Sequence, residues 1–227
     1  MKLMRIDLIL PVNNSNILTQ DAVCVLNLPA DIHCEIKRPE NNLLEITNAQ
    51  DEAKAIPSIL KAIQDSADEG ADAAIVYCFG EPGVEQAKSR VSIPVFGIAS
   101  PAMHMASQLG CRFSVIASMQ AHCPLINALA ERFGLITRMS DPVSINISPN
   151  ELINNDELLF VRVTEVIKQC FEKDHVNVFV LGCGSMQLKG RKIQQLIKAQ
   201  LGYDIIVIDP LLAAIYFTMG VVKMKRT

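Results

Sequence analysis

The chain has 227 residues, which is enough for one large domain or two small ones. Half of the residues are hydrophobic and 20% are charged, so the composition excludes a disordered protein. A net charge of −3, scattered basic residues and the absence of tryptophan argue against a nucleic-acid-binding protein.

The seven cysteines are odd in number, and no two of them are spaced as CxxC. This pattern argues against a disulfide framework and against a zinc site. Free thiols are typical of a reducing compartment, so we expect a cytoplasmic protein.

Two apolar segments resemble membrane sequences. The N-terminal run MKLMRIDLILPV contains Arg5 and Asp7, which favours a first strand over a signal peptide. The run at 205–222 is interrupted by Asp209 and Pro210, which divide it into a short strand and a buried helix. We therefore expect no membrane association.

Strand-like and helix-like segments alternate through the first part of the chain. Residues 51–70 are amphipathic with helical spacing and end at Gly70, and Pro82 suits the first turn of a helix. In chain order we predict a strand at 4–10, a helix at 16–27 capped by Asn14 or Ser15, a strand at 32–37, a helix at 51–70, a strand at 73–77, a helix at 82–90 and a strand at 93–98.

The alternation continues in the second part. We predict a helix at 101–109, a strand at 112–118, a helix at 121–133, one long helix within 150–173, a strand at 177–183, a helix at 187–201, a strand at 204–208 and a helix at 210–222. Continuous β-branched runs between amphipathic helices are typical of parallel sheets that are covered on both faces, so the fold class is α/β.

A faint internal repeat relates the two parts. Cys78 ends one apolar strand and Cys183 ends another, 105 positions later (183 − 78), and the same spacing separates Asn13 from Ser118. Two similar lobes, each with a thiol at the carboxyl end of a strand, would place both thiols where parallel sheets bind ligands.

Two facing thiols are suited to inverting a carbon next to a carbonyl group. A thiolate removes the proton from one face, and a thiol supplies a proton to the other. Helices that follow Cys78 and Cys183 would lower the pKa of these thiols, and backbone N–H groups near Gly80 and Gly184 could hold the enolate oxygen. This chemistry needs no metal and no cofactor.

The remaining candidate residues have ordinary structural explanations. LGCGSM lacks the glycine spacing of a phosphate loop. His104 and His122 fall within predicted helices, which favours packed or surface histidines over general bases. Glu81 either caps the following helix or, pointing inward, would raise the pKa of the Cys78 thiol. We expect the other five cysteines to be small buried side chains, namely Cys24, Cys34, Cys111, Cys123 and Cys170.

Four segments resemble the aspartate/glutamate/hydantoin racemase superfamily, and within it the hydantoin and allantoin racemase branch. The stretch at 51–83 is similar to the branch's D-E-A helix and C-F-G-D-P-G motif, and VFVLGCGSM at 178–186 is similar to its L-G-C-x-G-M motif. LILPVNNS at 8–15 resembles the first strand and its N-P-N-T-S turn, and the segment at 93–118 also resembles the branch.

The resemblance implies two pseudo-symmetric α/β lobes, each with a mainly parallel sheet, and an active site between them. We expect the first lobe to comprise 1–98 and 209–227, and the second 99–208. The resemblance also implies a homo-oligomer that acts on a small molecule.

The same resemblance makes Cys78 and Cys183 the two catalytic bases of a cofactor-independent racemase. It implies that the substrate pocket is lined by Asn13, Phe79, Gly80, Ser118 and Gly184. Amino-acid racemases of the superfamily carry side chains for an α-carboxylate after each cysteine, whereas Phe79, Gly80 and Gly184 suit a neutral or weakly acidic ring.

Several positions depart from the branch pattern, and they bear on the substrate more than on the reaction. Pro11-Val12-Asn13-Asn14 replaces N-P-N-T, Glu81 replaces Asp, Ala117-Ser118 replaces a threonine pair, and Ser185 replaces a glycine.

Three functions remain open from the sequence. The first is a racemase of 5-substituted hydantoins or a ureide such as allantoin. The second is an aspartate or glutamate racemase, or a decarboxylase or isomerase of a small diacid. The third is a ligand-binding module without catalysis, because a fold does not fix a function.

Overall fold

The protein is represented by a computed structural model that describes residues 3–14, 16–24 and 26–226. The chain divides into two compact units, one of 1–98 with 214–227 and one of 99–213. The second division falls inside the last helix, Pro210–Arg226, whereas the sequence-based boundary precedes this helix. The two units are described in turn.

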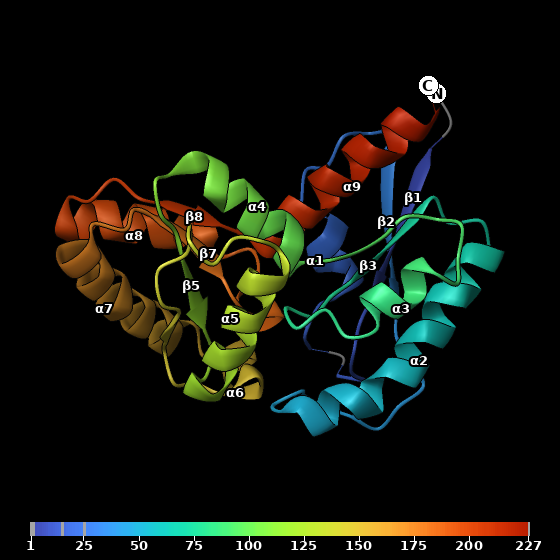
Figure 1. Ribbon diagram of the computed structural model, residues 1–227, viewed down its shortest axis with the longest axis horizontal. Coiled ribbons are helices and arrows are strands. Elements are labelled where there is room, and N and C mark those ends of the chain that lie inside the picture. Colours follow the sequence, from blue (N-terminus) through green and yellow to red (C-terminus); the bar gives the residue numbers. More distant parts are fainter. Residues whose placement is uncertain (1–2, 15, 25, 227) are drawn as a thin grey trace. The chain divides into compact units, whose positions relative to one another are not determined.

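The first unit contains a sheet of four parallel strands in the order β2-β1-β3-β4, of which Figure 1 labels β1, β2 and β3. Helices α2 and α3 cover one face, and Phe217 of α9 packs edge-on against Phe96 of β4. The bounds are β1 Met4–Ile9, α1 Gln20–Cys24, β2 Ile32–Lys37, α2 Ala49–Asp68, β3 Ala73–Val76, α3 Val84–Lys88, β4 Val95–Gly97 and α9 Pro210–Arg226.

Helix α2 follows directly from its sequence. The Asn48 side chain accepts hydrogen bonds from the N–H groups of Gln50 and Asp51, which caps the helix. Its apolar stripe, including Ile59 and Ile63, is fully buried against the sheet. Gly70 follows with φ of 82°, a left-handed conformation that glycine adopts without steric cost.

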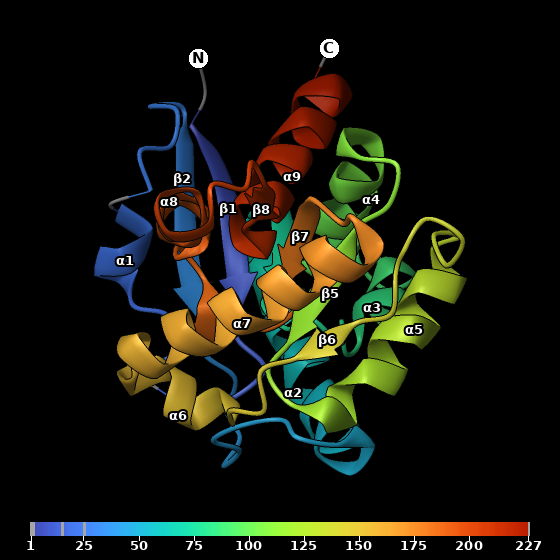
Figure 2. The same cartoon turned by 90° about the vertical axis from the view of Figure 1, so that its left-hand side faces the viewer.

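The second unit contains a four-stranded parallel sheet in the order β6-β5-β7-β8, and Figure 2 shows the short β6 beside β5. Helices α7 and α8 pack on one core cluster with β5, β7 and β8. The bounds are α4 Ala99–Leu109, β5 Ser114–Ala117, η1 Gln120–His122, α5 Cys123–Arg132, β6 Val143–Ser144, α6 Pro149–Asn154, α7 Asp156–Asp174, β7 Val178–Leu181, η2 Gly184–Met186, α8 Gly190–Leu201 and β8 Ile206–Ile208.

The structure confirms the α/β class and the two helix-flanked parallel sheets, and it corrects several elements. The long helix predicted within 150–173 is present as α7, and the short α6 precedes it as a separate helix, because the Asn155 side chain accepts from the N–H of Leu158 and caps α7. The helix predicted from Pro82 begins at Val84 instead, after a left-handed Gly83.

Other boundaries also differ from the predicted ones. The helix predicted at 187–201 begins at Gly190, and the one predicted at 16–27 is limited to α1. Ser15, the alternative cap, lies outside the described residues. Strand β6 was not predicted, because two residues have no detectable periodicity.

The apolar run at 205–222 divides as predicted, with β8 ending at Ile208 and α9 beginning at Pro210. Among the described residues, no helix has both the length and the apolar character that crossing a bilayer requires.

Candidate active site

The first candidate thiol lies just beyond a fully buried strand. All four residues of β3 are buried, and the N–H of Tyr77 still donates to the carbonyl of Ile9 at 2.8 Å. The N–H of Cys78 instead donates to the carbonyl of Val76 at 2.9 Å, so the chain leaves the sheet at the cysteine. Cys78 is partly exposed and packs against the core under α2.

A tight turn follows Cys78. The carbonyl of Cys78 accepts a hydrogen bond from the N–H of Glu81 at 3.1 Å, and the carbonyl of Glu81 accepts one from Val84 at 3.3 Å. Gly83 lies in the left-handed region with φ of 77°. This turn reverses the chain within six residues and leads into α3.

The second candidate thiol lies beyond strand β7 in the other unit. The N–H of Gly182 donates to the carbonyl of Ile116 at 2.8 Å, and Cys183 is extended with φ of −150°. A Cβ at Gly182 would lie 2.7 Å from Cγ1 of Val115 and 2.9 Å from the carbonyl oxygen of Ile116. The close approach of β5 therefore requires glycine before the thiol.

The two thiols occupy equivalent positions in the two sheets. Ile9 pairs with Val76 in the first sheet, and Ile116 pairs with Leu181 in the second. Each cysteine follows the last paired residue of its strand by two positions. The 105-residue spacing of the cysteines therefore reflects a structural repeat.

The equal spacing of Asn13 and Ser118 does not reflect the structural repeat. Ser118 follows the paired residue Ile116 by two positions, and the residue that follows Ile9 by two is Pro11. The equal spacing of Asn13 and Ser118 in the sequence therefore does not mark equivalent positions.

The other cysteines divide into two groups. Burial raises the pKa of Cys34 to about 12 and that of Cys170 to about 11, and it also raises the pKa of Cys123. Cys24 and Cys111 are exposed, so the prediction that they are buried is wrong. Cys24 ends the short helix α1, and Cys111 follows α4, where the core does not cover them.

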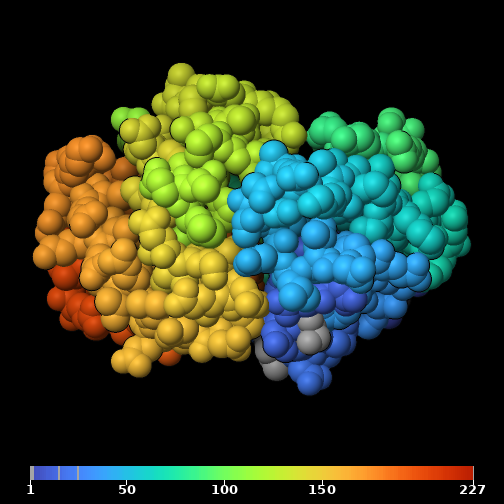
Figure 3. All heavy atoms as spheres, turned by 90° about the horizontal axis from the view of Figure 1, so that it is seen from below, coloured from blue at the N-terminus to red at the C-terminus, as the bar shows by residue number. Residues whose placement is uncertain are grey.

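The predicted pocket residues of the first unit follow β1 and β3. Phe79 is buried, Gly80 is half-buried and Asn13 is exposed. The N–H of Asn13 donates to the carbonyl of Leu43 at 2.8 Å. Leu43 belongs to the segment between β2 and α2, which is light blue at the surface in Figure 3.

The predicted pocket residues of the second unit follow β5 and β7. Ser118 is fully buried, and Gly184 is half-buried. The two strands are neighbours, so Ser118 and Cys183 follow adjacent paired positions at one edge of the sheet. The structure thus groups the predicted residues of each unit at the carboxyl ends of its central strands, which is the edge where parallel sheets bind ligands.

One polar contact at this edge is not predicted from the sequence. The Ser118 Oγ lies 3.0 Å from Nδ1 of His122, which is half-buried in η1. Ser118 is predicted to end a strand and His122 to lie in the next helix, so no single periodicity relates them, and their nearness in the sequence is the only signal. His104, in contrast, lies exposed on α4 with Nδ1 2.7 Å from the carbonyl oxygen of Ser100, as expected for a surface histidine.

No cluster of three or more His, Cys, Asp or Glu side chains with the arrangement of a metal site occurs among the residues that the structure describes.

The sequence and the fold both match known racemases. The family model described as Asp/Glu/Hydantoin racemase matches residues 33–218. A hydantoin racemase of Rhizobium meliloti is 28% identical over 198 residues, which are 85% of this chain and 80% of that protein. A hydantoin racemase of Pseudomonas sp. (strain NS671) is 25% identical over 188 residues, which are 83% of this chain and 73% of that protein.

The solved structure of an allantoin racemase from Klebsiella pneumoniae has the same fold. It superimposes with a TM-score of 0.85 at 25% identity, over 98% of this chain and 89% of that one. These matches support a racemase of the hydantoin and allantoin branch and confirm the prediction of an enzyme of the isomerase class. With the family model covering most of its length, the chain belongs to the Asp/Glu/hydantoin racemase family.

Proposed function

We propose that the protein is a cofactor-independent racemase of a 5-substituted hydantoin or a related ureide such as allantoin, with Cys78 and Cys183 as its two bases. The curated relatives and the allantoin racemase of Klebsiella pneumoniae support this substrate class. The observation that carries the proposal is the equivalent position of the two thiols, each two residues past the last paired residue of a central strand.

The reaction is a proton transfer that balances without any other reactant. The thiolate of one cysteine takes the proton from the stereogenic ring carbon, which breaks the C–H bond and forms an S–H bond. The electron pair moves into the adjacent carbonyl, giving an enolate. The thiol of the other cysteine then protonates the opposite face of the carbon and becomes the thiolate.

The two thiols are suited to this role by their environment. Both are partly exposed, whereas the buried Cys34 and Cys170 have raised pKa values that keep them protonated. Because a thiolate is the reactive form of cysteine, a base of this kind needs access to solvent and to substrate. Cys78 and Cys183 combine that access with a place at the ligand-binding edge of a sheet.

The remaining predicted residues would bind the ring. Backbone N–H groups in the turns at Gly80 and Gly184 would stabilise the enolate oxygen as it becomes charged. Phe79 would contribute apolar surface, and the side chains of Asn13 and Ser118 would bind the polar edge of the ring.

Proton–deuterium exchange in heavy water, followed by NMR and polarimetry, tests the proposal. Single enantiomers of slowly racemising aliphatic hydantoins and of allantoin are incubated with and without enzyme, because hydantoins also exchange spontaneously. We expect exchange at the stereogenic carbon together with loss of optical rotation. The Cys78→Ala/Cys183→Ala double variant is the matched protein control.

The same assay includes aspartate, glutamate and a small diacid. Exchange on an amino acid in place of the ring substrates would replace the proposal with an amino-acid racemase of the same family. Absence of exchange across the whole panel would refute the proposed substrate class.

A further inference from the structure

The turn after Cys78 carries a buried carboxylate in an unfavourable backbone conformation. Glu81 has φ of 57°, and only 5% of its surface is exposed. The left-handed region favours glycine, and the following Pro82 restricts Glu81 further. Gly80, its neighbour, does not have a positive φ. A long, ionisable side chain thus occupies a position where glycine would be less strained, which points to a role for that side chain.

The Glu81 side chain occupies the space next to Gly97 at the end of strand β4. A Cβ on Gly97 would overlap with Cγ, Cδ and Oε1 of Glu81. Gly97 pairs in register with Val76, the last residue of the strand that leads to Cys78. Since the N–H of Glu81 also donates to the carbonyl of Cys78, Glu81 joins the thiol-bearing turn to the outer strand of the sheet.

The second unit has a buried carboxylate at the corresponding place. Val180 pairs with Ile208, and extending this register by one residue places Asp209 opposite Leu181, the last residue of the strand that leads to Cys183. Asp209 is only 8% exposed.

The hydrogen bonds of Asp209 join three parts of the second unit. Its Oδ1 accepts from the N–H groups of Leu211 at 3.0 Å and Leu212 at 3.2 Å, at the start of α9. Its Oδ2 accepts from the N–H of Leu188, which follows the thiol-bearing turn and is itself left-handed with φ of 62°. Burial raises the pKa of Asp209, and these three N–H groups oppose that change.

The two units have corresponding contacts, but the group that carries the carboxyl side chain differs between them. The N–H of Met186 donates to the carbonyl of Cys183 at 3.0 Å, as that of Glu81 does to Cys78 at 3.1 Å, so Met186 and Glu81 are equivalent. In the first unit the turn supplies the carboxylate, and the outer strand supplies a glycine. In the second unit Asp209, the residue after the outer strand β8, supplies the carboxyl group, and the turn region supplies the N–H of Leu188.

We infer that each thiol-bearing turn is anchored to the outer strand of its own sheet by one buried carboxylate, Glu81 for Cys78 and Asp209 for Cys183. Both are positioning residues that act through the thiols. Asp209 holds its turn through hydrogen bonds to backbone N–H groups, which are costly to leave unpaired in a buried place. Glu81 holds its turn by filling the space beside Gly97. That these anchors serve racemisation rests on the proposed function.

Site-resolved alkylation tests the anchors without depending on catalysis. Iodoacetamide labelling over time, read by peptide mass spectrometry, gives a separate rate for each cysteine. The variants are Glu81→Gly, Gly97→Ala, their double variant and Asp209→Asn. Glycine is favoured at φ of 57°, so Glu81→Gly removes the carboxylate while it relieves the backbone.

We expect each carboxylate to control its own thiol. Glu81→Gly and Gly97→Ala should change the Cys78 rate by about tenfold and leave Cys183 within about twofold, and Asp209→Asn should do the reverse. In the Glu81→Gly background, Gly97→Ala should have little further effect, because the space it needs is then free. The exposed Cys24 and Cys111 are internal standards, one in each unit.

Equal changes at both thiols, no change at either, or a full additional effect of Gly97→Ala in the double variant would overturn the inference. Faster labelling of the buried Cys34 would reveal unfolding of the first unit, and faster labelling of the buried Cys170 would reveal unfolding of the second. If Asp209→Asn unfolds the second unit, the comparison of Glu81→Gly with its double variant decides the inference. With an active substrate, each variant should lower kcat more than it changes KM.

Failure of the proposed function is distinguishable from failure of this inference. A protein that exchanges no substrate but shows thiol-specific rate changes would retain the anchors and lose the proposed reaction. An active racemase whose alkylation rates at Cys78 and Cys183 do not respond to these variants would retain the proposed reaction and overturn the anchors.

Discussion

The two candidate thiols differ from the other cysteines in their burial and in the backbone around them at the ends of their strands. Burial is one difference, because Cys78 and Cys183 are partly exposed, whereas the other five are either buried or exposed. What Cys78 and Cys183 share is a backbone that leaves the sheet at the cysteine, followed by a turn that accepts a hydrogen bond on the cysteine carbonyl. Partial exposure and position relative to the sheet together identify them.

Removing either thiol should abolish racemisation. Because a positioned base contributes about 10²–10⁴-fold, Cys78→Ala and Cys183→Ala should each lower the rate by at least about a hundredfold in a polarimetric assay. Cys24→Ala and Cys111→Ala are matched controls at exposed thiols and should retain activity. Wild-type activity in either active-site variant would contradict the two-base mechanism.

Gly182 should tolerate no side chain. The clash with Val115 and Ile116 predicts that Gly182→Ala lowers the free energy of unfolding by about 1–3 kcal/mol, as overpacking does. Gly220, inside α9, is the control, because a Cβ added there would meet no atom within 4 Å. There alanine should be neutral or stabilise by up to about 1 kcal/mol in urea unfolding, because it favours the helix. Equal effects at both glycines would contradict the close approach of β5.

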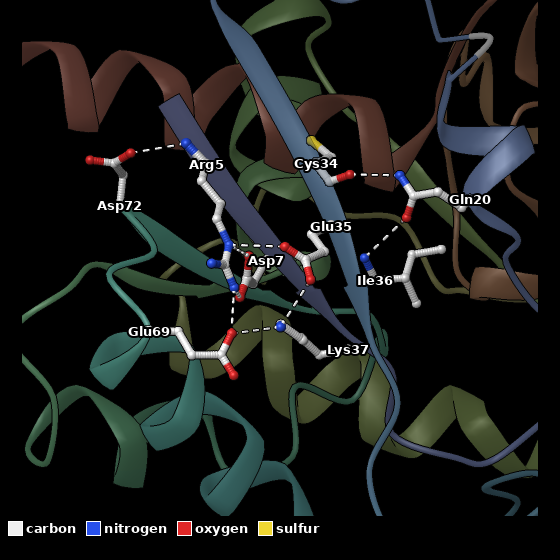
Figure 4. Close-up of polar contacts among 9 residues, drawn as sticks. All are labelled: Arg5, Asp7, Gln20, Cys34, Glu35, Ile36, Lys37, Glu69 and Asp72. Atoms are coloured by element: carbon white, nitrogen blue, oxygen red, sulfur yellow. Dashed lines mark hydrogen bonds and ion pairs between the residues drawn. The ribbon is translucent and has the colours of Figure 1, made fainter. Parts of the chain in front are cut away.

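At the scale of secondary-structure elements, a charge network joins β1, β2 and the end of α2 (Figure 4). Arg5 forms two hydrogen bonds to the fully buried Asp7, at 2.8 and 2.9 Å, and one to Glu69 at 2.7 Å. Lys37 binds Glu69 at 2.8 Å and Glu35 at 3.0 Å. These pairings raise the pKa of Lys37 and lower that of Glu69 to about 2.

The same view shows how the edge strand β2 is covered. The Gln20 side chain donates to the carbonyl of Cys34 at 2.8 Å and accepts from the N–H of Ile36 at 3.3 Å (Figure 4). Gln194 similarly accepts from the N–H of Val207 in the edge strand β8 at 2.8 Å. Both sheets thus have side-chain partners for backbone groups that would otherwise invite pairing with another chain.

The charge network should make folding stability depend on acid. The pKa of Glu69 is about 2 in the folded protein, below its ordinary value of 4.5, so its contribution is complete above 4.5 and is lost as pH falls toward 2. The difference in stability between wild type and Glu69→Gln should therefore shrink across that window in urea unfolding. Lys37 and Arg5 supply the opposing charges.

Glu165→Gln is the matched control, because it removes one exposed pair with Arg162 on α7. Such a pair contributes about 0–1 kcal/mol, so its effect should be small at every pH. A constant difference between wild type and Glu69→Gln from neutral pH to pH 2 would contradict the assigned pKa.

For the whole molecule, the main result is one strand order used twice. Both sheets place their first strand second in order and their third strand beside it, and the thiol follows that third strand in each unit. The last turn of α9 belongs to the first unit and is held there by Lys223 with Asp31 at 3.0 Å and by Arg226 with Asp72 at 2.6 Å. Lys225 also donates to the carbonyl of Ser92 at 3.3 Å.

Truncation after Val222 should therefore affect one unit. Hydrogen exchange measured by mass spectrometry should rise in β1 to β4 and remain unchanged in β5 to β8, because only the first unit loses contacts. The expected effect is modest, since exposed ion pairs contribute about 0–1 kcal/mol each. Equal acceleration in both units would show that they unfold together and would contradict the assignment of the end of α9 to the first.

Local pattern is sufficient for most of the elements, because strand and helix periodicities arise from backbone geometry within a few residues. All seven predicted strands are present, and Cys78 and Cys183 are found at strand exits from their position after buried apolar runs. Boundaries shift where caps intervene, as at Asn155 and Gly83. The two-residue β6 is too short for any pattern to detect.

The sequence alone therefore establishes the fold class, the candidate thiols and the family resemblance. The register of the strands, the contact of Ser118 with His122, and the carboxylates that anchor the thiol-bearing turns depend on the folded chain. Glu81 and Gly97 are distant in sequence, as are Leu188 and Asp209, and nothing in either segment specifies its partner. Such pairings arise only when parallel strands bring separate segments to one edge of a sheet, so they belong to tertiary structure rather than to local pattern.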